Sequence, residues 1–127
     1  MLILESSIKI NKNFTNLYTK AGLLDLKGNS KEAKEIRNNA FNLGNEAQIN
    51  TAGYQFLFSG KTAEALEIFK LNMEKFPNSW NVYDSYAEAL LAIKDNVGAK
   101  KYYEKALRLV TDDTNKTRIK NILANMK

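Results

Sequence analysis

One stretch of this chain recurs further along it, and the repeat limits the possible folds more than any other property. Residues 60–69 align with residues 94–103, so Ala65 and Ala99 occupy matching positions. A third, shorter copy lies at residues 28–33, at nearly the same interval before the copy that begins at residue 60. Repeats at such an interval stack similar units on one another, each packing mainly against its neighbours. We therefore expect a stack of related units.

Each unit has the pattern of two helices. Apolar residues recur at steps of three and four, as in Ala65, Phe69 and Met73, which is the stripe of an amphipathic helix. A single proline and scattered glycines are typical of helices joined by short turns, which makes neighbouring helices antiparallel. The periodicity predicts an all-α chain with eight helices, at residues 2–10, 14–27, 30–43, 46–58, 62–76, 80–93, 96–110 and 114–126.

The interval from Ala65 to Ala99 and the two-helix unit resemble the tetratricopeptide repeat (TPR). Small residues stand where the helices of a TPR hairpin approach most closely, and here these are Gly53, Ala65, Ala87, Ala99 and Ala106. Larger side chains at these places would push the helices apart. The resemblance implies an α-solenoid of antiparallel helix pairs. We expect one domain over residues 1–127, with hairpins at about 14–45, 46–79 and 80–113, an N-terminal half-repeat and a capping helix at 114–127.

The segment from Ala52 to Leu107 is similar to the C-terminal TPR tails of certain bacterial proteins, on residues 53–54, 71–72, 77–85 and 102–107. Such tails follow either a serine β-lactamase-like or esterase-like hydrolase domain, or a domain of unknown function in exported proteins. The resemblance implies an accessory module of a larger bacterial protein, whose missing N-terminal domain is then a candidate partner.

The composition excludes most catalytic chemistry. The chain has no His and no Cys, so it cannot build a Ser-His-Asp triad, a thiol nucleophile or a zinc site of the usual nitrogen and sulfur ligands. Asp84 and Ser85 have no base beside them, and we interpret both as helix-surface polarity. We expect no enzymatic activity, no catalytic residue, no cofactor and no metal site.

The resemblance also suggests where a ligand binds, because the first helix of each TPR hairpin lines a concave groove. Positions spaced i, i+3 and i+7 share one face of such a helix. The predicted groove residues are Thr15, Tyr18, Asn50, Tyr54, Asn81, Asp84 and Glu88. Tyr offers a large rigid contact area, and Asn both donates and accepts hydrogen bonds. We expect a protein-interaction scaffold that binds a peptide or protein segment, and the two carboxylates favour a basic or amide-rich one.

The basic end of the chain supports an alternative function. Residues after Ile93 include nine basic and four acidic side chains, within a net charge of +5. Binding of nucleic acid or an anionic surface would use Lys100, Lys101, Arg108, Lys116, Arg118 and Lys120. A solvated helical face explains the same charge, and no aromatic spacing indicates base stacking, so we do not expect nucleic acid as a partner.

A purely structural role is the third alternative. Leu2, Leu4 and Ile8 form an apolar side of the first predicted helix, which could drive self-association or dock on a missing domain. The longest apolar runs are far shorter than the roughly 20 residues that cross a bilayer, and the N-terminus lacks the features of a signal peptide. We expect a soluble chain, cytoplasmic by default and periplasmic or exported if it is the tail of a secreted parent.

Two residues are predicted to cap second helices of hairpins. Asn29 and Asp95 each precede such a helix and can accept hydrogen bonds from its first N–H groups. Glu32, three residues after Asn29, would complete a capping box. Lys61 occupies the matching place in the middle repeat and cannot act in this way.

Overall fold

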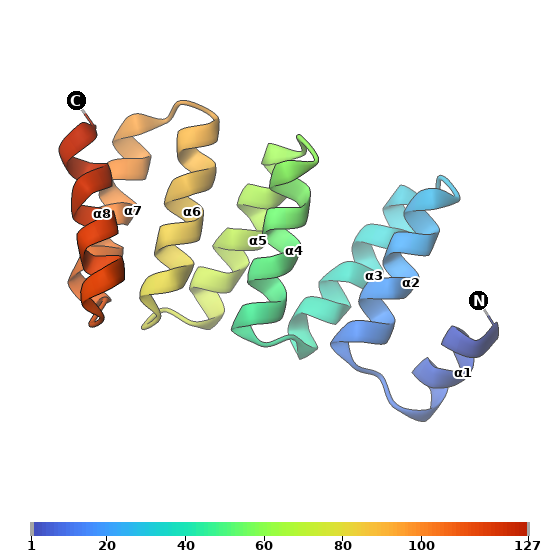
Figure 1. The fold of residues 1–127 in the computed structure, drawn as a ribbon. Helices are drawn as coiled ribbons and strands as arrows, with labels where there is room; N and C mark the ends of the chain where they lie inside the picture. The colour runs from blue at the N-terminus through green and yellow to red at the C-terminus, as the bar shows by residue number, and fades with distance from the viewer. Residues whose placement is uncertain (1, 127) are drawn as a thin grey trace. The chain divides into compact units, whose positions relative to one another are not determined.

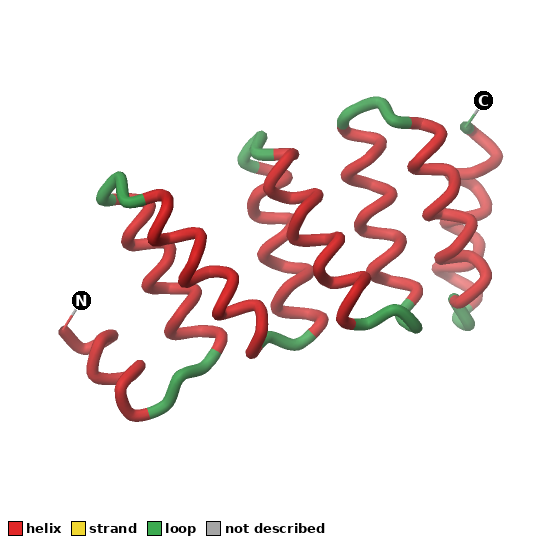
Figure 2. Tube along the Cα trace, turned by 180° about the vertical axis from the view of Figure 1, so that it is seen from behind, coloured by secondary structure: helices red, strands yellow, loops and turns green. Residues whose placement is uncertain are grey.

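The computed structural model describes residues 2–126 and is all-helical over this range (Figures 1 and 2). The described residues form eight helices and no strand: α1 (Leu2–Ile10), α2 (Phe14–Leu26), α3 (Ser30–Leu43), α4 (Glu46–Phe58), α5 (Thr62–Lys75), α6 (Trp80–Ala92), α7 (Asn96–Leu109) and α8 (Asp113–Asn125). Every helix predicted from the periodicity is confirmed, with its ends within one residue of those expected. Within the described range, no helix combines the length and the apolar character needed to cross a membrane.

The helices belong to two compact units, the first ending at Gln48 and the second beginning at Ile49. The first unit contains α1, α2 and α3, and the second contains most of α4 together with α5 to α8. In Figure 1, α2 and α3 lie side by side in opposite directions, as do α6 and α7. The expected antiparallel packing of neighbouring helices is therefore present in both units.

One turn geometry recurs in the three hairpins. Gly28, Gly60 and Lys94 have positive φ angles of 84°, 80° and 64°. In each turn this residue donates its N–H to the carbonyl three residues back, and the next residue donates to the carbonyl five residues back, at 2.9 to 3.1 Å. This is the Schellman arrangement, which satisfies carbonyls at the end of the first helix and favours glycine at the left-handed position. A repeated backbone turn thus matches the repeat in the sequence.

The small residues lie at the expected close contacts. Ala65, Ala87, Ala99 and Ala106 are completely buried. A Cβ atom added to Gly53 of α4 would lie 2.6 Å from Cδ1 of the Phe69 ring on α5, far closer than real contacts of this kind. The prediction that larger side chains would separate these helices is consistent with this geometry.

Each unit has an apolar core of its own. In the first unit, Ile8 of α1, Leu17 of α2 and Ala40 of α3 pack together. The second unit contains a larger core, which α6, α7 and α8 share: Val82, Tyr83, Leu90, Tyr103, Val110 and Ile119 are among its buried members. Because Ile119 is fully buried, α8 is held by apolar packing as well as by the polar contacts described below.

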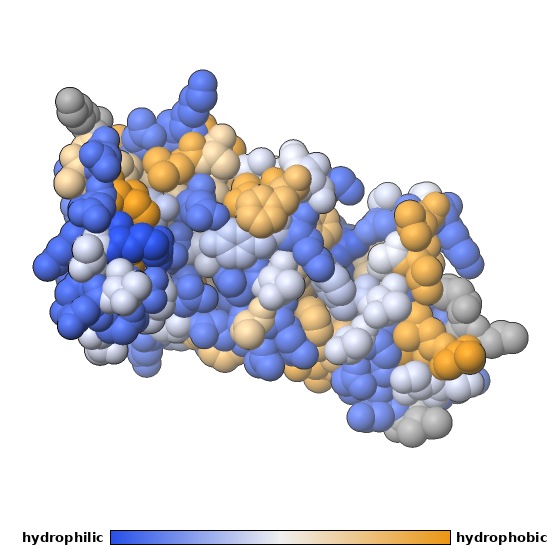
Figure 3. Space-filling model, viewed as in Figure 1, coloured by the Kyte–Doolittle hydropathy of each residue, from blue (hydrophilic) through white to orange (hydrophobic). Residues whose placement is uncertain are grey.

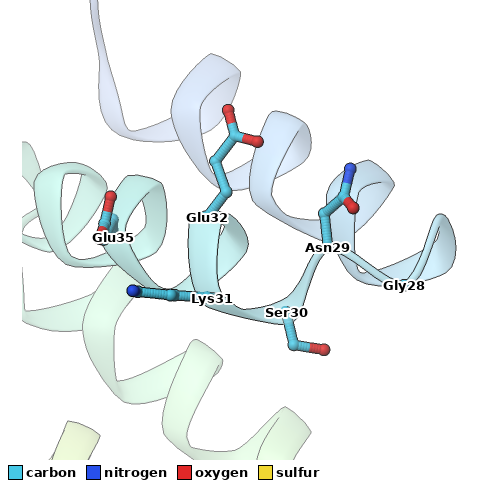
Figure 4. Close-up of a pocket in the computed structure, with 6 residues that line it drawn as sticks. All are labelled: Gly28, Asn29, Ser30, Lys31, Glu32 and Glu35. Carbon is cyan, nitrogen blue, oxygen red and sulfur yellow. The ribbon is translucent and has the colours of Figure 1, made fainter.

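The predicted helix caps have different outcomes. The Asp95 carboxylate accepts a hydrogen bond from the N–H of Gly98 at 2.9 Å, so this cap is confirmed. Asn29 makes no side-chain capping bond, and the expected capping box with Glu32 is wrong. Both side chains extend outward from the start of α3 (Figure 4), which leaves its first N–H groups without the expected acceptor. Reciprocal capping boxes that the sequence analysis missed join Asn13 with Asn16 and Asn45 with Gln48.

Candidate functional site

The predicted groove residues of the first unit, Thr15 and Tyr18, both lie on α2 but differ in burial. Thr15 is exposed, and its carbonyl accepts a hydrogen bond from the hydroxyl of Thr19 at 2.8 Å. Tyr18 is half-buried and stacks on Phe14 with a centroid separation of 5.1 Å. Burial raises the pKa of the Tyr18 phenol, whereas the charge of Arg37 lowers it. Tyr18 thus belongs to the edge of the apolar core of this unit.

In the second unit, side chains from α4, α6 and α8 form a group that we call the polar cluster. Its members are Asn50, Tyr54, Asp84, Ser85, Glu88 and Arg118. Four of the five groove residues predicted for this unit are therefore brought together. In Figure 3, strongly hydrophilic side chains lie between α8 and α6, next to apolar ones. Asn81 is half-buried one turn before Asp84 on α6 and lies outside the cluster.

One part of the polar cluster connects α4 to α6 through a serine. The Ser85 hydroxyl donates to Oδ1 of Asn50 at 2.6 Å and accepts from the hydroxyl of Tyr54 at 3.3 Å. The Tyr54 ring also packs edge-on against Phe69, with centroids 5.1 Å apart. Burial raises the pKa of Tyr54 to about 12, so its phenol stays neutral and able to donate. The ring and the hydroxyl of Tyr54 are both held in place.

The other part of the polar cluster connects α6 to α8 through an ion pair. Nη2 of Arg118 donates to Oδ2 of Asp84 at 2.9 Å. The Asp84 side chain is only 10% exposed, whereas that of Arg118 is 41% exposed. The second oxygen of Asp84, Oδ1, is buried and has no hydrogen-bond partner. Burial raises the pKa of Asp84, and the hydrogen bond and charge of Arg118 oppose that rise.

Glu88 adds a second carboxylate one helical turn after Asp84. The residue is exposed, yet partial desolvation raises the pKa of its carboxyl, while a hydrogen bond with Tyr54 lowers it. The charge of Asp84 raises this pKa and that of Arg118 lowers it. Burial, followed by the charges of both carboxylates, also raises the pKa of the buried Tyr103 phenol on α7. When both carboxylates are ionised, they face one guanidinium, so the polar cluster carries an excess negative charge.

An exposed aromatic ring lies beside the polar cluster. Phe58, the last residue of α4, is 80% exposed and stacks on Tyr54 with ring centroids 5.5 Å apart. Figure 3 shows an apolar patch over this end of α4. The face formed by α4 and α6 therefore combines an apolar contact with a charged one.

The interpretation of Asp84 and Ser85 as helix-surface polarity is wrong, because both residues are buried. Their side of α6 is covered by α4 through Asn50 and by α8 through Arg118. The sequence did contain a signal for these partners. Asn50, Asp84 and Arg118 follow one another at the same interval that separates Ala65 from Ala99, so the repeat spacing extends into α8.

Some of the basic residues predicted to bind nucleic acid or an anionic surface make contacts within the protein itself. Arg118 is paired with Asp84. The ammonium group of Lys101 lies 5.4 Å from the centroid of the Tyr102 ring. Such cation–π contacts hold part of the basic charge against the protein's own rings.

The apolar side of α1, predicted as a self-association surface, packs into the core of the first unit, to which α1 belongs. Ile8 is buried in the core and Leu4 packs against it. An ion pair between Lys20 of α2 and Glu5 of α1, at 3.2 Å, also ties the two helices together. The side chain of Leu2 lies outside the described ones. Leu4 and Ile8 are therefore already used in packing within the unit.

A shallow depression on the first unit is a weaker candidate. It is lined by Gly28, Asn29, Ser30, Lys31, Glu32 and Glu35. Figure 4 shows the side chains of Ser30, Lys31 and Glu32 pointing in different directions, so they do not converge on one ligand group. Among the residues that the structure describes, no three His, Cys, Asp or Glu side chains gather as potential metal ligands.

Two comparisons with known proteins found no match. No protein-family model matches the chain, and a search of curated proteins gives no significant match. The geometry of the second unit is therefore the basis for the proposal that follows.

Proposed function

We propose that the chain is a TPR-type solenoid module without catalytic activity, and that it binds a protein segment on the face of α4 and α6. The recurrence of residues 60–69 at 94–103 supports the TPR assignment. The recurring turns at Gly28, Gly60 and Lys94 support it further, as does the close approach of α4 and α5 at Gly53. An accessory role in a larger bacterial protein is part of the same proposal.

The observation that carries the binding proposal is the exposed Phe58 ring beside the polar cluster. Aromatic residues are enriched at protein interfaces, where a few of them supply most of the binding free energy. The Phe58 ring stacks on Tyr54, which Ser85 and Phe69 hold in place. A partner would therefore meet an ordered surface and lose little additional conformational entropy on binding.

A selection from a random 12-residue phage-displayed peptide library tests the proposal, with the whole chain as bait. We expect the enriched peptides to bind the wild type and to lose about tenfold or more in affinity for Phe58→Ser, as is typical of an interface hot spot. Val97→Ser is the matched control, because Val97 is 85% exposed, close to the 80% of Phe58, but lies on α7. Binding to this control should be unchanged.

Circular dichroism of both variants checks that they remain folded, which their exposure leads us to expect. If the library yields no enriched peptide, or if the enriched peptides bind Phe58→Ser as well as the wild type, the proposed binding face is wrong. Equal losses for Phe58→Ser and Val97→Ser would show general stickiness of apolar surface instead of a defined site.

A further inference from the structure

From the imbalance of charge in the polar cluster, we infer that the ligand carries an arginine or lysine whose side chain replaces Arg118 at Asp84 and also reaches Glu88. Arg118 is then the internal occupant of a cation-binding position. This inference rests on the proposed function, since it specifies the chemistry of the segment that the face of α4 and α6 binds.

The first argument is the unsatisfied acceptor on Asp84. An ionised carboxylate has about four acceptor sites, and an unpartnered buried oxygen is costly. Arg118 supplies one bond, from Nη2 to Oδ2, and leaves Oδ1 without a donor although the side chain is only 10% exposed. A guanidinium or ammonium group placed between Asp84 and Glu88 would bring several N–H donors to this oxygen and to the neighbouring carboxylate.

The second argument is that Arg118 can leave without removing α8. Its side chain is 41% exposed and contacts Asp84 through a single nitrogen, so the guanidinium can turn into water. The incoming cation would then compensate the buried charge of Asp84, which would be costly to leave without a partner. The Nε of Arg118 donates to Asn115 on the same helix at 3.2 Å, a contact that exchanges readily with water. The fully buried Ile119 continues to hold α8 in the apolar core.

The third argument is the chemistry around the two carboxylates. Glu88 is exposed and lies one turn from Asp84, so it presents negative charge at the surface. Tyr54 adjoins Glu88, the Phe58 ring stacks on Tyr54, and aromatic faces attract cations. Acidic and aromatic groups together favour a cationic ligand, and the aliphatic stem of an arginine or lysine suits the exposed ring of Phe58.

The test uses fluorescein-labelled heptapeptide mixtures that are degenerate except for a fixed central residue: arginine, lysine, citrulline or glutamate. Binding to the full chain is followed by fluorescence anisotropy at low salt. We expect the arginine and lysine mixtures to bind and the citrulline mixture, which keeps the shape but lacks the charge, to bind about tenfold or more weakly. Higher salt should weaken the binding of the charged mixtures.

Three variants make the test specific to the site. Arg118→Gln removes the internal competitor and should tighten binding of the arginine mixture several-fold. Glu88→Gln should weaken the same binding about tenfold, since one of the two carboxylates loses its charge. Glu104→Gln removes an exposed carboxylate from α7 and should change neither binding nor fold.

Equal binding of the arginine and citrulline mixtures, or of none of the four, would overturn the inference. Preference for central glutamate would overturn it too, because Arg118 would then be the recognising group. If circular dichroism shows that Arg118→Gln does not fold, the inference is decided by comparing how tightly Glu88→Gln and Glu104→Gln bind the arginine mixture. Enriched phage peptides whose binding needs Phe58 but no positive charge would leave the proposed function intact while this inference fails.

Discussion

The hairpins α2–α3 and α6–α7 share a turn geometry but differ at matching positions of their first helices. On α2, Tyr18 stacks on Phe14 at the edge of an apolar core. At the matching position of α6, Asp84 is buried in an ion pair with Arg118. The turns and the small residues between paired helices thus recur, whereas this position of the first helix differs. The side chains at this position therefore differ between the two hairpins although the turns do not.

We expect the largest change in stability at a glycine of a first helix. Gly53 lies at a close contact between two helices, whereas Gly22 lies at an open position. Gly53→Ala should lower the free energy of unfolding by about 1–3 kcal/mol, because the added Cβ overpacks the Phe69 ring. Gly22→Ala should raise it by about 0.5–1 kcal/mol, because a Cβ atom added to this glycine of α2 would meet no other part of the protein within 4 Å and alanine favours the helix. Urea unfolding followed by circular dichroism measures both.

Stabilisation by Gly53→Ala would mean that Phe69 moves aside at little cost, and the close approach of α4 and α5 would then not be a constraint. A destabilising Gly22→Ala would show that this part of α2 is packed in solution.

The link between α4 and α6 should give the next largest effect. Ser85→Ala removes the hydroxyl shared by Asn50 and Tyr54, and we expect a loss of about 1 kcal/mol in the free energy of unfolding. Ser59→Ala is the control, because this exposed serine donates only to the carbonyl of Gln55 at 2.7 Å. It should change stability by less than about 0.5 kcal/mol. Equal effects of the two substitutions would show that the buried hydrogen bonds add nothing.

The helices could be predicted from the sequence because apolar periodicity and turn residues are local signals. The burial of Asp84 and Ser85 is not predicted, for the opposite reason: it depends on α4 and α8, which lie far away in the chain. The clustering of basic residues predicts that Arg118 belongs to a basic surface. Its spacing from Asp84 equals the repeat interval, however, which indicates that the two residues occupy matching positions of successive repeats. The failed cap at Asn29 shows that a suitable side chain does not by itself fix its own orientation.

The turn between α6 and α7 differs from the other two Schellman turns because its left-handed residue is not glycine, and substitution can measure the energetic cost of this difference. Lys94 has a φ of 64°, a conformation that is strained for residues with a Cβ atom, whereas glycine occupies this place in the other two turns. Lys94→Gly should therefore raise the free energy of unfolding by about 0.5–1 kcal/mol. Gly60→Ala should lower it by a similar amount, since the turn geometry is the same. If Lys94→Gly is destabilising, the cost of glycine's flexibility in the unfolded chain exceeds the relief of strain.

The smallest expected effect concerns the pH dependence of stability at Asp84. Burial raises the pKa of this carboxyl, against the opposing influence of Arg118, and the other ionisable groups near it are Glu88, Tyr54 and Tyr103. A raised pKa means that the folded protein holds the proton more tightly than the unfolded chain does. The contribution of Asp84 to stability is then complete below its ordinary pKa and is lost as the pH rises through the raised value.

Asp84→Asn cannot titrate and keeps an oxygen for Arg118, so it isolates this contribution. We expect the wild type to lose stability relative to Asp84→Asn as the pH rises from about 4 to 7, measured by urea unfolding at several pH values. Parallel pH profiles would mean that ion pairing with Arg118 balances the effect of burial, and the opposite slope would mean that it outweighs it.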